Sequence, residues 1–162
     1  QMYAETIEAM EKAGRMQYEI SNFAKPGFES QHNLIYWNNQ NYFGFGAGAS
    51  GYLGKKRYKN RGPIQHYLRA LKEDHLPILE EEQLSTKEQI EEEMFLGLRK
   101  ILGVEKAVFQ ARFGQSLTSI YGEVIEKLKH QKLITETDSS IYLTKTGLFR
   151  GNDVFEQFLI SK

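Results

Sequence analysis

Residues 116–143 read SLTSIYGEVIEKLKHQKLITETDSSIYL, a polar start followed by an amphipathic run and two short apolar segments. The first part predicts a helix over residues 116–131, because its apolar side chains recur at helical spacing: Leu117, Ile120, Tyr121, Val124, Ile125 and Leu128. Residues 133–136 and 141–143 flank the turn at Asp138-Ser139-Ser140 and have the pattern of two paired strands. The stretch therefore predicts a helix followed by a small β-hairpin.

The residues on either side complete a helical domain around this stretch. Ser85, with a glutamate three residues later, forms a capping box that begins a helix, which we expect to end at Gly103. Its inward residues are expected to be Ile90, Met94, Leu98, Ile101 and Leu102. A short helix over 104–113 follows, and a last helix covers about 145–160. Three helices followed by a β-wing is the winged-helix order, so we predict a winged-helix-like domain over residues 85–162.

The first half, residues 1–84, is rich in aromatic residues and glycine, and we place a domain boundary near Leu84. Helices and strands are expected to alternate along it, with helices over 3–13 and 32–39 and strands over 16–20 and 42–47. That alternation predicts an α/β unit with parallel strands. Later parts of this half are a strand or hairpin arm over 52–58 and a helix from Pro63 to about Asp74, with Ile64, Tyr67, Leu68 and Leu71 on its apolar stripe.

Composition excludes several classes of protein. The 162 residues carry 21 basic and 21 acidic side chains and no cysteine, so this chain holds neither a disulfide framework nor a thiolate metal centre. No apolar run is long enough for a membrane span, and the polar start lacks the pattern of a signal peptide. We therefore expect a cytoplasmic protein. The abrupt start inside a helical pattern predicts a fragment of a longer chain.

A glycine-rich motif over residues 46–51 follows a predicted strand with the spacing G-x-G-x-x-G. A dinucleotide site would need a helix directly after it, and the glycine-interrupted, basic residues that follow are a poor helix start. A strand end whose missing side chains let a ligand approach the backbone fits better. A glycine-rich turn with no ligand remains the alternative.

A second motif, His32-Asn33-Leu34-Ile35-Tyr36-Trp37, combines an imidazole, an amide and two large aromatic rings. His32 and Tyr36 are four residues apart and so share one face of a helix. They could face a planar ligand, since imidazole ligates metals and flat rings stack. By residue chemistry alone a packed aromatic cluster is the more common outcome.

Charge runs give little support for nucleic-acid binding. Residues 55–61 contain five basic side chains in seven, a pattern more typical of a solvated loop than of a phosphate site. The predicted helix over 116–131 could enter a DNA groove, but residues 85–162 carry as many acidic as basic side chains. Nucleic acid is therefore a disfavoured partner.

Several motifs together resemble a known family. The segments Tyr18 to Gly27, His32 to Trp37 and Tyr42 to Ser50 resemble the end of the radical SAM barrel of oxygen-independent coproporphyrinogen III oxidases. The H-N-x-x-Y-W form is similar to the branch regarded as haem chaperones. Residues 85–162, with Leu-Gly-Leu-Arg and Leu-Thr-Lys-Thr-Gly-Leu motifs, are similar to the C-terminal domain of that family.

The resemblance implies that residues 1–84 are the last strands and helices of a partial TIM-like barrel, with a linking helix. It also implies S-adenosylmethionine and a [4Fe–4S] cluster in a longer protein, whose N-terminal segment would supply the cysteine ligands that this chain lacks. By motif position, Gly48, Ala49 and Ser50 would lie on the S-adenosylmethionine side. A porphyrin or haem would meet the residues of the second motif, His32, Asn33, Tyr36 and Trp37.

Three functions follow from these observations. The first is the C-terminal portion of a porphyrin-linked protein, either a haem-delivery protein or an oxidase that decarboxylates coproporphyrinogen III; the resemblance to the chaperone branch favours haem delivery. The second is a winged-helix nucleic-acid-binding module, and the third is a packing domain without activity. The cysteine-free chain alone is expected to be inactive in radical chemistry, with no catalytic residue and no metal ligand of its own.

Overall fold

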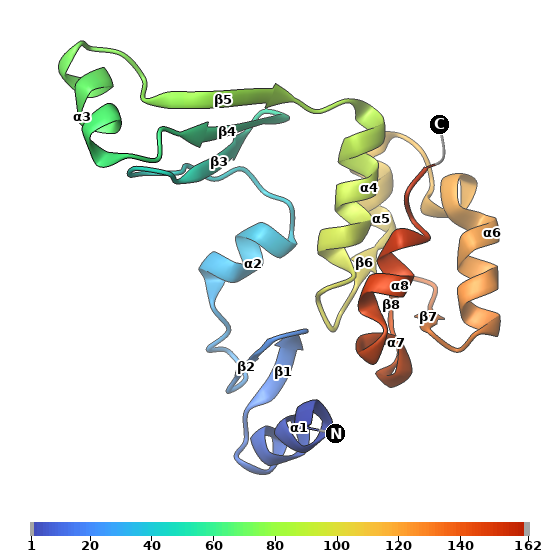
Figure 1. The fold of residues 1–162 in the computed structure, drawn as a ribbon. Coiled ribbons are helices and arrows are strands. Elements are labelled where there is room, and N and C mark those ends of the chain that lie inside the picture. Colours follow the sequence, from blue (N-terminus) through green and yellow to red (C-terminus); the bar gives the residue numbers. More distant parts are fainter. Residues whose placement is uncertain (1, 161–162) are drawn as a thin grey trace. The chain divides into compact units, whose positions relative to one another are not determined.

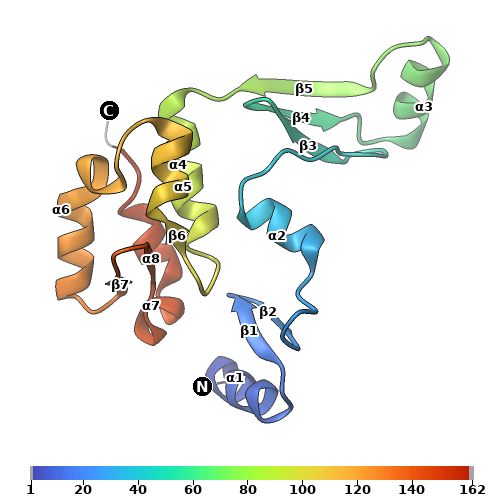
Figure 2. The ribbon, with the colours of Figure 1, turned by 180° about the vertical axis from the view of Figure 1, so that it is seen from behind.

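The computed structural model describes residues 2–160, which fold as an α+β protein of two compact units. Unit 1 joins the residues up to Asn39 with those from Ile90 onward, and unit 2 is the intervening segment Gln40–Gln89. Figures 1 and 2 show the elements of both units from opposite sides. Within the described residues, no helix has both the length and the apolar character of a membrane span.

The first part of unit 1 is a helix, a hairpin and a second helix. Its elements are α1 (Met2–Lys12), β1 (Met16–Glu19), β2 (Asn22–Ala24) and α2 (Gln31–Trp37). The predicted helix and strand at 3–13 and 16–20 are confirmed within a residue or two. β1 also meets the chain beyond α4, because the Ile20 amide donates to the Arg99 carbonyl and the Ile101 amide donates to the Tyr18 carbonyl.

The second part of unit 1 contains most of the core. It comprises α4 (Thr86–Gly97), which begins in unit 2, and then β6 (Val104–Glu105), α5 (Lys106–Phe113), α6 (Leu117–His130), β7 (Ile134–Glu136), β8 (Ser140–Leu143), α7 (Lys145–Phe149) and α8 (Gly151–Glu156). The three strands form a sheet in the order β6-β8-β7. The most deeply buried side chains of its core are Met94, Leu98, Phe109, Leu117, Ile125, Leu128, Ile141, Val154 and Phe158. The apolar spacing of the α6 sequence therefore identifies its buried face correctly.

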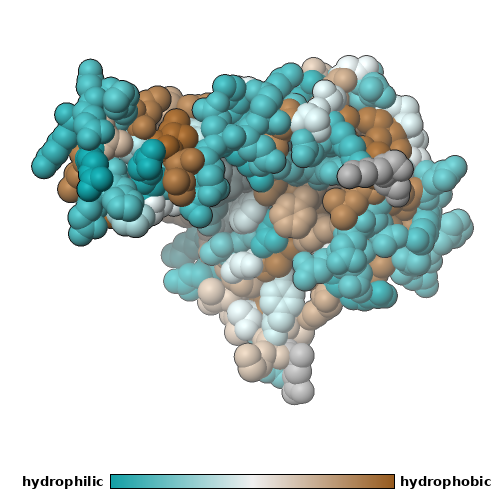
Figure 3. Space-filling model, turned by 45° about the horizontal axis from the view of Figure 1, so that its top comes forward, coloured by the Kyte–Doolittle hydropathy of each residue, from teal (hydrophilic) through white to brown (hydrophobic). Residues whose placement is uncertain are grey.

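Unit 2 is a three-stranded sheet with one helix. It contains β3 (Ser50–Leu53), β4 (Lys56–Asn60), α3 (Ile64–Lys72) and β5 (Ile78–Gln83), with strand order β3-β4-β5. Gly54 and Lys55 join β3 to β4 with φ values of +54° and +73°, and a two-residue turn of this kind matches the twist of the strands that it connects. At the left of Figure 3, where α3 and the adjoining strand ends lie, apolar surface is exposed among hydrophilic side chains.

The prediction of parallel strands is wrong. All strand pairs of the described residues are antiparallel, and the β1–β2 and β3–β4 pairs are hairpins. Connections of two residues permit only antiparallel pairing, whereas a parallel pair needs a long crossover. The predicted strand over 42–47 is also absent; Tyr42 makes an isolated bridge to Tyr52, and the strand lies later, at β3.

Four further expectations are corrected. The basic run over 55–61 is largely the middle strand β4 and not a loop, because β5 supplies a facing row of glutamates. The helix expected to reach Gly103 ends at Gly97, and Leu102 is 79% exposed. The last helix is divided into α7 and α8 at Arg150, whose φ of −123° is not helical. The predicted inward stripe of α3 is half exposed, at Ile64, Leu68 and Leu71.

Candidate functional site

Helix α2 carries the histidine motif on a short, capped segment. The Ser30 side chain accepts a hydrogen bond from the Asn33 amide, which begins the helix one residue before Gln31. One helical turn separates His32 from Tyr36, and their rings meet edge to face with centroids 4.8 Å apart. The His32 Nε2 and the Tyr36 hydroxyl are 3.1 Å apart. Because His32 is exposed, its imidazole is accessible to a ligand while Tyr36 orients the ring.

The other two residues of the motif face the body of unit 1. Asn33 donates from Nδ2 to the hydroxyl of Tyr18 on β1, at 3.2 Å. Arg99 lies over the indole ring of Trp37, with its Cζ 4.6 Å from the ring centroid. The Trp37 Nε1 is buried and has no hydrogen-bond partner among the described residues. The motif thus has an exposed half, which a ligand can reach, and a half that anchors the helix.

Polar contacts at the end of α2 fix its position in unit 1. Lys100 donates from Nζ to the Asn38 Oδ1 at 2.7 Å, and burial lowers the pKa of this lysine. Asn39 donates from Nδ2 to the Glu93 Oε2 at 3.2 Å, and Arg112 forms an ion pair with the same carboxylate. Glu93 is only 7% exposed, so its carboxylate is largely removed from water, whereas the Arg112 side chain is partly exposed. Pattern reasoning missed these residues, because no local signal links them to the motif.

The glycine-rich loop lies in unit 2, directly before β3. Gly46 and Gly48 have φ values of +101° and +72°, and a Cβ built on Gly46 would meet no heavy atom within 4 Å. The Ala49 amide donates to the Gly46 carbonyl at 3.3 Å, and the Ala49 carbonyl accepts from the Asn60 amide at 2.8 Å. A strand and not a helix follows the loop, which agrees with the expectation from the sequence that this motif is not a dinucleotide site.

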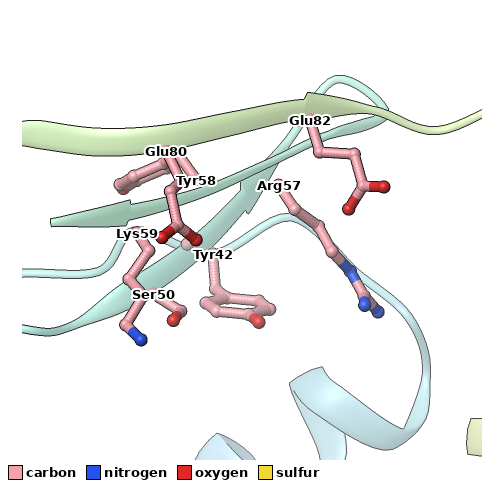
Figure 4. A pocket seen from close by; sticks show the side chains of 8 residues that line it. Tyr42, Ser50, Arg57, Tyr58, Lys59, Glu80 and Glu82 are labelled. Carbon is pink, nitrogen blue, oxygen red and sulfur yellow. The ribbon is translucent and has the colours of Figure 1, made fainter.

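Next to this loop, one face of the sheet forms a polar hollow of about 380 Å³. Figure 4 shows the side chains that line it, among them Ser50, Arg57 and Lys59 on the strands and Tyr42 from the preceding segment. Glu82 and Glu80 stand opposite Arg57 and Lys59 in the β4–β5 register. The hollow therefore offers both signs of charge, a hydroxyl and an aromatic ring to a ligand.

The structure groups the predicted site residues in two local sets. His32, Asn33, Tyr36 and Trp37 share α2 in unit 1, whereas Gly48, Ala49 and Ser50 belong to unit 2. Within each set the residues lie together, as their spacing predicts. In the part of the chain that the structure describes, no three His, Asp or Glu side chains gather in the manner of a metal site.

Comparison with known proteins agrees with these motifs. Residues 84–150 match the model of the HemN C-terminal domain. The chain is 49% identical to the heme chaperone HemW of Bacillus subtilis and 50% identical to that of Lactococcus lactis, in each case over 98% of its own length. It spans about 42% and 41% of the length of these two relatives.

A solved structure has a similar fold. The coproporphyrinogen III oxidase HemN of Escherichia coli, a radical SAM enzyme, matches 96% of this chain with a TM-score of 0.73. The match covers 39% of that protein at 14% sequence identity, so it concerns the fold alone. Residues 84–150 therefore match the HemN C-terminal domain, and the chain as a whole is similar in sequence to part of the heme chaperone HemW proteins.

Proposed function

We propose that this chain is the C-terminal part of a porphyrin-linked radical SAM protein that binds and delivers haem. The observation that carries the proposal is the accessible imidazole of His32, set edge-on to Tyr36 on a helix that polar contacts hold in place. Neutral imidazole is a common iron ligand, and flat rings provide contact area for a tetrapyrrole. Two relatives about half identical to the chain bear the name heme chaperone, which supports the same ligand.

In this proposal residues 1–84 complete a partial barrel, residues 85–162 form a winged-helix-like domain, and the protein is cytoplasmic. The remaining part of the longer protein is then the first partner of this chain. The half-exposed apolar residues of α3, Ile64, Leu68 and Leu71, support that role, because an apolar helix face gains stability when another segment covers it.

In this proposal, the rest of the longer protein binds the iron–sulfur cluster, and this chain contributes contacts to S-adenosylmethionine. A thiolate-held [4Fe–4S] cluster does not fit these residues, since the chain has no cysteine; its ligands would lie elsewhere in the longer protein. S-adenosylmethionine fits better. Gly46 and Gly48 leave space at the loop, and the charged hollow beside Ser50 suits its zwitterionic end. The Ala49 amide already donates within the loop, whereas its carbonyl accepts one hydrogen bond from the Asn60 amide and has a second lone pair, so we assign that residue a carbonyl contact and Ser50 a hydroxyl contact. When bound, this cofactor supplies the radical chemistry of the longer protein.

A haem titration of the intact natural protein tests the proposal. We expect the Soret band to shift on binding, and we expect His32→Ala to weaken binding or change the band. His130→Ala, on α6, is the matched control and should bind as the parent does. Absence of any Soret change in the parent protein would contradict haem delivery.

The alternative function is oxygen-independent decarboxylation of coproporphyrinogen III. The motifs that resemble coproporphyrinogen III oxidases support it, whereas the two relatives named heme chaperone favour haem delivery. A decarboxylation assay run beside the titration separates the two. Activity with no Soret change assigns the oxidase, and a Soret change with no activity assigns haem delivery.

A further inference from the structure

A second hollow, of about 360 Å³, lies in unit 1 between the end of β1 and helices α7 and α8. Part of its wall is apolar, with Ile20, Leu148 and Phe155 among the lining residues. Arg99 and Arg150 add two guanidinium groups to the same wall. The wall thus combines guanidinium groups with a smaller apolar part, which suits a ligand that has an apolar body and a carboxylate at its edge.

The arginines of this hollow have unused N–H donors and a net positive charge, both of which favour binding of an anion. Arg150 donates from Nε to the Asp153 Oδ2 at 2.9 Å, which uses one of the five N–H donors of its guanidinium. The Nε of Arg99 is buried and has no hydrogen-bond partner among the described residues. With Asp153, the two arginines give one net positive charge, which one carboxylate would balance.

Arg99 connects this hollow to the histidine motif. The same guanidinium that lines the hollow lies over the ring of Trp37, 4.6 Å from its centroid, and Trp37 is on α2 with His32. Both features belong to unit 1. Arg99 therefore links the hollow to the Trp37 side of α2, the side that anchors this helix in unit 1.

We propose that Arg99 and Arg150 form a carboxylate-binding site that receives a propionate of the tetrapyrrole. This inference rests on the proposed haem function and adds to it the group on the ligand that is recognised. Arginine suits the task, because its planar fork pairs with both oxygens of a carboxylate.

The test uses the intact natural protein with two probes, iron protoporphyrin IX and its dimethyl ester, which lacks free carboxylates. We expect the ester to bind about tenfold more weakly than haem, as the loss of a charge-assisted hydrogen bond implies. Arg150→Gln should weaken haem binding by a similar factor and leave ester binding unchanged. Arg15→Ala, at an exposed arginine of the turn after α1, is the control and should bind both probes as the parent does.

A second variant guards against misfolding as an explanation. Asp153→Asn removes the carboxylate that competes for Arg150, so it should tighten haem binding about two- to threefold without affecting the ester. Equal affinity of the parent for haem and ester, or equal weakening of both probes by Arg150→Gln, overturns the carboxylate site while leaving haem binding intact. Failure of the parent to bind either probe overturns the haem function, and the carboxylate site with it.

Discussion

The guanidinium of Arg99 covers the indole ring of Trp37, with 4.6 Å between Cζ and the ring centroid. All of unit 2 separates the two residues in the sequence, so this contact joins the two segments of unit 1. A cation over an indole face contributes about 0.5–1 kcal/mol at an exposed site and more when water is excluded. The pair thus helps to hold α2 against the helical part of unit 1.

This contact predicts a fluorescence change. Trp37 is the single tryptophan of the chain, so its emission reports on this ring alone. We expect Arg99→Ala to shift the emission of the 162-residue chain to longer wavelength, because water replaces the arginine side chain over the indole. Arg15→Ala should leave the spectrum unchanged. An unaltered spectrum in Arg99→Ala would show that the arginine does not shield the ring.

Substitution of Gly103 is expected to destabilise unit 1. Its φ is +72°, and a Cβ built there would lie 1.9 Å from the Ile141 carbonyl oxygen. Gly103→Ala should therefore lower the free energy of unfolding by more than about 2 kcal/mol, measured by urea denaturation. Gly114 has nearly the same φ, +71°, but open space around it. Gly114→Ala should thus cost only the backbone strain, about 1 kcal/mol, and equal losses in the two variants would contradict the steric argument.

Truncation of the core residue Phe109 is expected to lower the stability of unit 1 strongly. This ring is fully buried and meets the ring of Phe113, with centroids 4.8 Å apart. Phe109→Ala should lower the free energy of unfolding by about 3–5 kcal/mol, because it leaves a cavity. Leu102 is 79% exposed, so Leu102→Ala should stay within about 0.5 kcal/mol of the parent. Similar losses in both variants would place the core elsewhere.

Acid should weaken the contacts of the β7 carboxylate Glu136. Lys106 and Lys129 each donate to it at 2.8 Å, and these bonds lower the pKa of Glu136. A carboxylate with a lowered folded-state pKa stabilises the protein above its unfolded pKa, and this contribution is lost as the pH falls through the folded pKa.

We therefore expect the melting temperature of the parent to fall between about pH 5 and pH 3 by more than that of Glu136→Gln. The two proteins should differ most above about pH 5, where the carboxylate is charged in both the folded and the unfolded state. Glu156→Gln, at an exposed glutamate of α8, should keep the pH dependence of the parent. Parallel pH profiles of parent and Glu136→Gln would remove this ion-pair cluster as the cause.

Local elements were predictable from the sequence because their signals are local. The capping box is present, since the Ser85 amide donates to the Glu88 carboxylate and the Glu88 amide donates to the Ser85 hydroxyl. The Ser85 hydroxyl also donates to the Glu88 carboxylate, and this bond together with the one from the Ser85 amide lowers the pKa of Glu88. The hairpin of β7 and β8 pairs in register, with Ile134 opposite Leu143. In each case, residues close in sequence determine the backbone geometry.

Strand pairing in the first half was not predictable in the same way. Apolar alternation marks a strand but carries no information on its partner, so parallel and antiparallel pairing could not be separated until the two-residue turns were visible. The basic residues of β4 have the pattern of a loop because the glutamates that pair with them lie on β5, beyond α3 in the sequence. Cross-strand charge pairs of this kind depend on register, which a single segment does not specify.

The amino-acid sequence alone indicates where the helices of the C-terminal half begin, which face of α6 is buried, and the motifs on α2 and before β3, because spacing and capping act over a few residues. The folded chain adds the contacts between distant segments. Arg99 lies over Trp37 because β1 is hydrogen-bonded to the chain directly after α4. Arg99 and Arg150 line the same hollow because residues of α7 and α8 form part of its wall. Such contacts arise from the packing of whole elements, so the sequence around Arg99, Trp37 or Arg150 does not indicate which residue each of them contacts.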